Sequence, residues 1–260
     1  MLAEPDRTPY DLNFRLFGIP VRVHPLFWLG AALLGAPTLT AGLGYLAIWI
    51  AVVFVSILVH ELGHAFAFRR FGSRSHIVLW MFGGLAVPHA GIAGRWRRIV
   101  ASLAGPAAGF VLCALVWGSA RLTDWPVTGG KPVVYLYVAL FLVNLYWGVM
   151  NLLPVFPLDG GQVSRELCDA KWRGRGFAVA LKISIGTAVA VAVYSLVCEL
   201  EGRSGRAGLT SVLPWWVPRG SFFTAILFGL LAAQSYQILQ QLRGGGFYSE
   251  APDDRVPWER

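Results

Sequence analysis

Residues 43–68 have the sequence LGYLAIWIAVVFVSILVHELGHAFAF. This apolar run is long enough to cross a bilayer as a helix, which takes about 20 residues. Its charged and imidazole side chains all fall in one pentapeptide, His60-Glu61-Leu62-Gly63-His64. Ionisable groups inside a membrane span are costly, so this cluster indicates a functional site. The alternative is that these groups mark the end of the helix, beside Arg69 and Arg70. Such ends are usually marked by Lys, Arg or Trp rather than by two His around a Glu.

The composition of the whole chain is that of a membrane protein. Of its 260 residues, 56% are hydrophobic and 14% are charged, whereas a soluble domain carries about 25% charged residues. The formal net charge is +8, but the basic residues lie between apolar blocks rather than in one patch. That distribution is typical of charge at a membrane surface and argues against a nucleic-acid partner. The sequence therefore predicts an all-α, polytopic protein surrounded by a lipid bilayer.

Six apolar segments are predicted to be transmembrane helices. They are about 25–40, 43–70, 96–120, 132–153, 176–198 and 220–242. The first is short and contains Gly35 and Pro37, so the sequence does not fix where it ends. We expect residues 1–243 to form one transmembrane domain. Residues 244–260, which are rich in glycine and charge, are expected to form a flexible tail.

Two stretches lack a helical pattern. Residues 14–23 alternate apolar and basic positions toward their end, which is typical of a strand. Residues 77–93 are apolar but broken by three glycines and a proline, which favours a hairpin or a re-entrant segment. We expect the strand and the hairpin to form a small β element near the cytoplasmic face.

The distribution of Lys and Arg predicts the orientation. Sixteen basic residues lie in the N-terminal segment, in the links after the second and fourth spans, and in the tail, whereas five lie on the other side. Because cytoplasmic loops are enriched in Lys and Arg, both termini are predicted to be cytoplasmic. The polar first residues lack the apolar stretch of a removable signal peptide. We therefore expect a multi-pass protein of the cell inner (plasma) membrane.

The pentapeptide at residues 60–64 has the H-E-x-x-H pattern of zinc metalloproteases. Positions i and i+4 of a helix share a face, so His60 and His64 can ligate one zinc ion. Glu61 lies beside that face, where it can take a proton from the attacking water as the catalytic base.

A catalytic zinc site needs a third protein ligand. His24, His76 and His89 lie in flanking segments, where the sequence shows no second polar partner. Asp159 is the better candidate, because two prolines and two glycines break the helix around it and let it point inward. The alternative is an ordinary turn in which Asp159 caps the next helix.

Asn151 stands alone among apolar neighbours, eight residues before Asp159. A buried amide needs hydrogen-bond partners. We expect it to bind the substrate carbonyl or its developing oxyanion. The alternative is a hydrogen bond between helices.

Together these residues resemble a known family. The H-E-L-G-H motif and N-x-x-P-x-x-P-L-D-G, from Asn151 to Gly160, are similar to the site-2 protease family of intramembrane zinc metalloproteases. Three further segments fit, namely Phe82-Gly83-Gly84, residues 104–108 (AGPAA) and residues 17–25. The resemblance covers about residues 14–170, and the two metal motifs in combination are highly specific.

The resemblance implies a zinc metalloendopeptidase that cleaves transmembrane segments of other proteins, as in regulated intramembrane proteolysis. It implies one zinc ion per chain, with His60, His64 and Asp159 as ligands and Glu61 as the base. Many relatives carry a PDZ domain or a CBS pair, for which the loops and tail here are too short. A regulatory membrane partner therefore stays unidentified.

A substrate helix must unwind before its peptide bonds can be cut. We expect residues 82–87, with Phe82, Gly83 and Gly84 at their start, to offer an edge strand that pairs with the extended substrate. The alternative is a re-entrant turn that only packs over the site.

Two other functions fit the same His pair. A membrane metal transporter or sensor would need polar residues along several spans, and the last two spans offer little beyond Lys182, Ser184, Thr187 and Gln234. A non-catalytic relative that binds membrane helices would not need His60, Glu61, His64 and Asp159 together.

Overall fold

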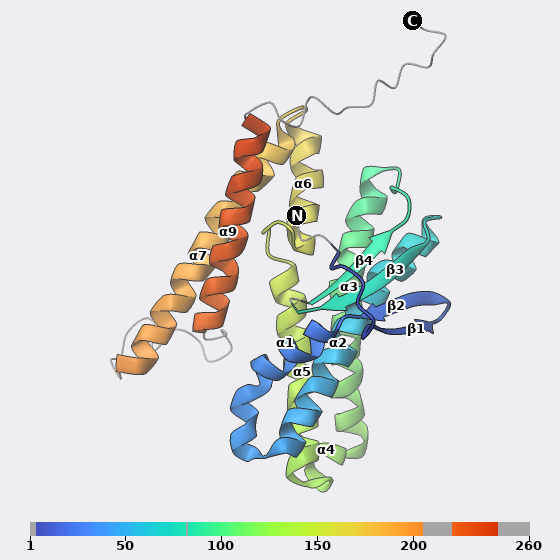
Figure 1. The fold of residues 1–260 in the computed structure, drawn as a ribbon, viewed down its shortest axis with the longest axis vertical. Coiled ribbons are helices and arrows are strands. Elements are labelled where there is room, and N and C mark those ends of the chain that lie inside the picture. The colour runs from blue at the N-terminus through green and yellow to red at the C-terminus, as the bar shows by residue number, and fades with distance from the viewer. Residues whose placement is uncertain (1–3, 82, 205–219, 244–260) are drawn as a thin grey trace, which may run out of the picture. The chain divides into compact units, whose positions relative to one another are not determined.

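The computed structural model describes residues 4–81, 83–204 and 220–243. These residues form two compact units, Met1–Leu152 and Leu153–Arg260 (Figure 1). The predicted single domain over 1–243 stays a prediction, and the predicted tail at 244–260 lies outside the described residues.

The first unit combines a small sheet with long helices. Its elements are β1 (Leu12–Leu16), β2 (Ile19–Val23), α1 (Pro25–Gly35), the 3-10 helix η1 (Ala36–Ala41), α2 (Leu43–Arg70), β3 (Ser75–Trp80), β4 (Gly83–Pro88), α3 (Arg95–Thr123), α4 (Trp125–Thr128) and α5 (Gly130–Asn151). In the second unit the described elements are helices: α6 (Asp159–Lys171), α7 (Gly176–Ser204) and α9 (Phe222–Arg243).

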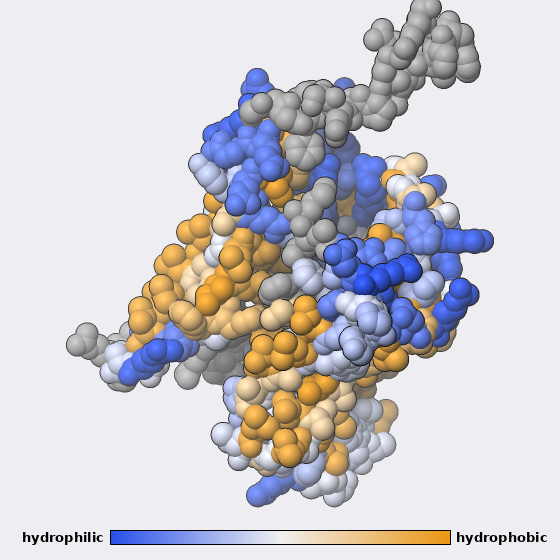
Figure 2. Space-filling model, in the orientation of Figure 1, coloured by the Kyte–Doolittle hydropathy of each residue, from blue (hydrophilic) through white to orange (hydrophobic). Residues whose placement is uncertain are grey.

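Five of the described helices, rather than six, are long and apolar enough to cross a membrane: α2, α3, α5, α7 and α9. Apolar side chains cover much of their visible surface, whereas polar side chains gather in the region of the sheet (Figure 2). The remaining predicted span, 25–40, is the 11-residue helix α1 followed by η1. Helix α1 is only about 17 Å long, because an α-helix rises about 1.5 Å per residue. The multi-pass helical fold that the sequence predicts is otherwise confirmed.

The four strands form one sheet in the order β1-β2-β3-β4. The predicted strand at 14–23 is a hairpin, β1–β2, that turns at Phe17 and Gly18, where φ is 51° and 79°. Two consecutive residues with positive φ are typical of a tight hairpin turn. Strands β3 and β4 form the hairpin predicted within 77–93. Strand β2 pairs with β3 in parallel, since α1 and α2 carry the chain across between them.

The core of this unit joins the sheet to α2. One face of the sheet contributes Val21, Val23, Ile77 and Leu79, which are at most 2% exposed. Leucine, isoleucine and alanine side chains of α2 pack against them, on the helix that carries the H-E-x-x-H motif. The sheet therefore fixes the position of the motif helix from one side.

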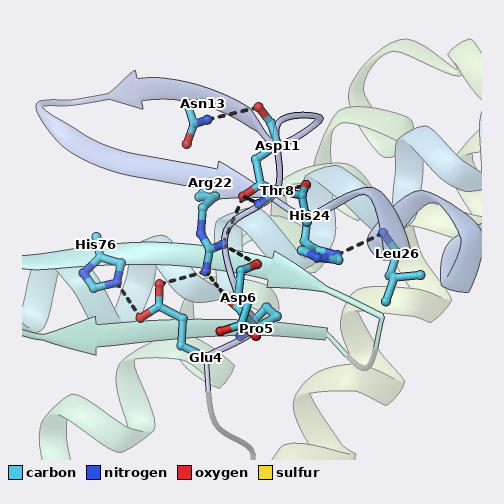
Figure 3. A network of polar contacts seen from close by, with 10 residues as sticks. All are labelled: Glu4, Pro5, Asp6, Thr8, Asp11, Asn13, Arg22, His24, Leu26 and His76. Carbon is cyan, nitrogen blue, oxygen red and sulfur yellow. Dashed lines mark hydrogen bonds and ion pairs between the residues drawn. The ribbon is translucent and has the colours of Figure 1, made fainter.

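The N-terminal residues Glu4–Asp11 fold back along the sheet and are bound through Arg22 of β2 (Figure 3). The guanidinium of Arg22 is buried and donates to Glu4 Oε1 at 2.8 Å and to Asp11 Oδ2 at 3.0 Å. It also donates to the backbone carbonyls of Pro5 and Asp6. A buried charge with this many acceptors is well compensated, so Arg22 organises the segment.

Arg22 also shifts the acidity of both carboxyl groups. Burial raises the pKa of Glu4, but hydrogen bonds and charges of His76 and Arg22 outweigh burial and hold it below its ordinary value. Burial likewise raises the pKa of Asp11, and hydrogen bonds from Thr8 and Arg22 hold it below its ordinary value. At a pH above their ordinary pKa values, both carboxylates therefore stabilise the folded segment. That stabilisation is lost as the pH falls through their lowered pKa values.

We predict that the protection of residues 4–23 against hydrogen exchange, relative to the intrinsic exchange rate at each pH, falls as the pH drops through the lowered pKa values of Glu4 and Asp11. In Arg22→Leu this protection should be low at every pH, because the acceptors have lost their donor. Arg15→Leu is the matched control, since Arg15 is exposed on the neighbouring strand. Protection that does not change with pH in the wild type, or equal effects of the two substitutions, would contradict this role of Arg22.

Candidate metal centre

His60 and His64 lie one turn apart on α2 and turn their rings toward each other. Their Nε2 atoms are 3.3 Å apart, and the residues are 3% and 6% exposed. Two imidazole nitrogens this close, in a dry site, suit one shared cation better than a bond to each other. The predicted ligand pair is therefore arranged as a metal site requires.

A carbonyl group fixes the tautomer of His64. The Nδ1 atom lies 2.7 Å from the carbonyl oxygen of Ala101 on α3. Because a carbonyl can only accept, Nδ1 carries the proton and Nε2 keeps its lone pair. Metal-bound histidines usually donate their other nitrogen in this way, which orients the ring and strengthens the ligand.

Glycines allow α3 to lie close to the motif helix. A Cβ atom on Gly105 would fall on Nε2 of His64, and one on Gly63 would fall on the carbonyl oxygen of Ala104. Helices with such small residues approach closely and hydrogen-bond across the interface. The AGPAA segment on the third predicted span therefore makes room for His64.

Glu61 is buried against the edge of the sheet. It is 5% exposed, and a Cβ atom on Gly84 of β4 would lie 2.6 Å from its Oε1 atom. The glycine thus lets the carboxylate lie against the strand backbone. Gly83, the first residue of β4, lies against the ring of Trp147. Phe82, the third residue predicted to bind substrate, lies outside the described residues.

Asn151 lies in the last turn of α5 and is buried. Its Nδ2 atom donates to the carbonyl oxygen of Trp147 at 2.9 Å, within the same helix. This bond within one helix differs from the alternative, which was a hydrogen bond between helices. The contact to substrate stays a prediction. Asn144, two turns earlier on the same face of α5, makes the bond between helices, donating to Ser56 of α2 at 2.9 Å.

Trp147 is a residue that the sequence analysis did not single out. Its ring centroid lies 6.5 Å from that of His60, with the planes nearly perpendicular. Among the described residues, its buried indole nitrogen has no hydrogen-bond partner. A tryptophan within an apolar span gives no sequence signal for this placement, because aromatic residues are common there.

The three other histidines have other roles in the first unit. His24 caps α1 by accepting from the backbone nitrogen of Leu26. His76 and His89, for which no polar partner was expected, lie 3.2 Å apart on β3 and just after β4, and His76 also contacts Glu4. The structure therefore corrects that expectation for His76 and His89.

Asp159 belongs to the second unit, where it is the first residue of α6 and half-buried. The cap position of this helix is Leu158, so Asp159 is not the capping residue that the alternative predicted. An acidic residue in the first turn is favoured by the helix dipole.

Two serines hold the loop before Asp159. Ser184 of α7 accepts from the backbone nitrogen of Phe156 at 2.8 Å, and Ser235 of α9 donates to the carbonyl oxygen of Phe156 at 3.4 Å. The two hydroxyl groups lie 2.8 Å apart and are buried. Non-helical backbone at membrane depth needs such partners. Ser184 was noted only as a polar residue in a span, and Ser235 was not noticed.

The chain belongs to peptidase family M50, whose model matches residues 48–125 and 127–194. This confirms the predicted resemblance to site-2 proteases. A zinc metalloprotease of Methanocaldococcus jannaschii, MJ0392, is 28% identical over 192 residues, covering 72% of this chain and 53% of the relative. The putative zinc metalloprotease Rip3 of Mycobacterium tuberculosis is 33% identical over 198 residues, covering 70% and 48%.

A putative zinc metalloprotease of Synechocystis, sll0528, is 28% identical over 251 residues, covering 87% of this chain and 60% of the relative. The chain thus spans about half the length of these relatives. The solved structure of the site-2 protease from Methanocaldococcus jannaschii matches with a TM-score of 0.58 and 24% identity, covering 88% of this chain and 94% of that one. That match shows a shared fold.

We predict that Gly105→Ala weakens metal binding, because the added Cβ atom displaces His64 Nε2. Disturbing the support of a metal ligand typically costs about 10- to 100-fold in affinity. The measurement is competition with a chelator for zinc. Gly109→Ala is the matched control, since its Cβ atom would meet Asn144 only at ordinary contact distance, 3.7 Å. Equal zinc affinity in the two variants would contradict the assignment.

Proposed function

We propose that this chain is an intramembrane zinc metallopeptidase that cleaves within or beside transmembrane segments of other proteins. The observation that carries the proposal is the His60–His64 pair, buried in a helix of membrane-spanning length with Glu61 beside it. Family membership and the names of the relatives support the same activity.

One zinc ion per chain is proposed, held by His60, His64 and Asp159. The hydrogen bond from His64 to Ala101 supports a deprotonated Nε2, as a zinc ligand requires. Two neutral imidazoles and one carboxylate are a common ligand set for catalytic zinc. The serine-held loop supports the role of Asp159, because it gives this residue a fixed backbone.

Zinc, when bound, supplies a Lewis acid that polarises the scissile carbonyl and the attacking water. Glu61 takes the proton from that water and later passes it to the nitrogen of the leaving amine. Burial suits this cycle, since a dry carboxylate exchanges its proton with the reactants rather than with bulk water. Asn151 is proposed to bind the substrate carbonyl through the donor capacity that its bond within α5 does not use.

The substrate is proposed to bind as an extended strand along β4. This strand is last in the sheet order, so its outer edge has no partner strand among the described residues. Gly84 lies against Glu61, which would bring the peptide bonds of a paired segment next to the base. Both termini are proposed to be cytoplasmic, in the plasma membrane, as the basic residues predict.

The transporter or sensor alternative is less well supported. It needs a polar path through several spans, but the hydroxyl groups of Ser184 and Ser235 are used to hold Phe156.

We predict that Glu61→Gln retains zinc but loses hydrolysis by at least about 100-fold, because general-base catalysis contributes that much or more. Cleavage is measured on a labelled transmembrane peptide with a helix-breaking centre, in detergent micelles, alongside metal analysis. Glu199→Gln is the control, since that glutamate lies in α7 and pairs with Arg203. Cleavage by Glu61→Gln at the wild-type rate would refute the assignment of Glu61 as the catalytic base.

Proline substitutions test the edge strand. Gly84 itself is unsuitable, because any side chain there also displaces Glu61. Consecutive strand residues direct their N–H groups to opposite sides, so one of Leu85 and Ala86 donates outward. We predict that proline at that position lowers cleavage while zinc content and melting temperature stay unchanged, whereas proline at the other breaks the hairpin. If both variants fold and cleave normally, the strand does not bind substrate.

A further inference from the structure

The second unit contains a basic pocket, defined by Arg165, Asp169, Arg175, Phe177, Lys182 and Arg243. It has a volume of about 430 Å³ and lies where α6, the start of α7 and the end of α9 meet. Leu239 and Leu242 of α9 complete its wall. At this end of α7 and α9 polar side chains give way to an apolar band along the helices (Figure 2).

Four of the lining residues are cations and one is an acid. Asp169 contacts Arg165 at only 3.8 Å, with both side chains about 40% exposed, so this pair is weak. The Arg165 guanidinium lies 4.3 Å from the ring centre of Phe177. This contact orients the plane of the guanidinium and leaves its N–H groups able to donate to an acceptor in the pocket. The pocket therefore retains a net positive charge that an anion would complement.

Lys182 lies about 9 Å along α7 from its first residue, within a helix of membrane-spanning length. No described residue forms an ion pair with it. An ammonium group at this depth is costly unless it reaches water or an anion. Lys182 lines the pocket together with cations of the two other helices, so an anion bound in the pocket would neutralise its charge.

The backbone around the pocket is tightly packed. Gly174 has φ of 75° in the turn from α6 to α7, and a Cβ atom on Gly176 would collide with Asp169. The tight turn between α6 and α7 therefore fixes the backbone of Arg175, which lines the pocket. The four cations converge from three helices and the turn, rather than lying along one solvated face.

We propose that this pocket binds the phosphate of an anionic phospholipid headgroup, with the acyl chains lying along the exposed apolar residues of α7 and α9. A soluble phosphate offers the same charge, but the leucine wall and the depth of Lys182 favour a ligand that enters from the bilayer. The proposal needs the membrane setting and does not depend on the zinc ligands or on proteolysis.

The experiment compares binding of phosphatidylglycerol and phosphatidylcholine to the full chain in neutral detergent, by native mass spectrometry and thermal shift. Each basic residue near a membrane surface contributes about fivefold to binding an anionic lipid, so Arg175→Gln/Lys182→Gln should weaken phosphatidylglycerol binding about 30-fold. Phosphatidylcholine binding should not change. Lys171→Gln/Arg173→Gln is the matched control, because it removes the same charge from the same corner outside the pocket.

Several outcomes would overturn the proposal. Equal losses in the two double variants would mean diffuse surface attraction, and inorganic phosphate that protects as well as phosphatidylglycerol would mean a soluble ligand. If Arg175→Gln/Lys182→Gln does not fold, Arg243→Gln, at the exposed end of α9, replaces it and should weaken binding about fivefold. Unchanged binding in that variant would also contradict the pocket.

Discussion

The hydrogen bond from His64 Nδ1 to the carbonyl oxygen of Ala101 is the interaction on which the proposed chemistry depends. It sets the tautomer, and so decides that Nε2 faces His60 with a lone pair. It can form only because Gly63 and Gly105 let α2 and α3 approach closely. The missing side chains of these two glycines thus allow the hydrogen bond that leaves a lone pair on Nε2 of His64.

A related constraint acts on several other polar groups in the apolar helices. With no water to satisfy them, buried polar groups need partners inside the protein. Asn144 binds Ser56 one turn before His60, which fixes α5 against the motif helix. In the second unit, Ser184 and Ser235 satisfy the backbone of Phe156 in the loop that leads to Asp159. Polar contacts in both units therefore support the segments that carry the proposed ligands.

The sequence predicted the helical membrane fold, the two β segments and the pairing of His60 with His64, because apolar length and helical spacing act locally. It did not predict that α1 is too short to span, since Gly35 and Pro37 left its end open. It also missed Ala101, Trp147 and Ser235. Backbone carbonyls carry no side-chain signal, and single aromatic or hydroxyl residues in apolar helices are too common to mark a site.

The most direct test of a zinc ion shared by His60, His64 and Asp159 is metal analysis of purified Asp159→Asn beside Asp169→Asn. Both residues lie on α6 and both changes remove one carboxylate charge. After dialysis against a chelator, the account predicts about one zinc per chain in the wild type and in Asp169→Asn, and little zinc in Asp159→Asn. Wild-type zinc content in Asp159→Asn would contradict it.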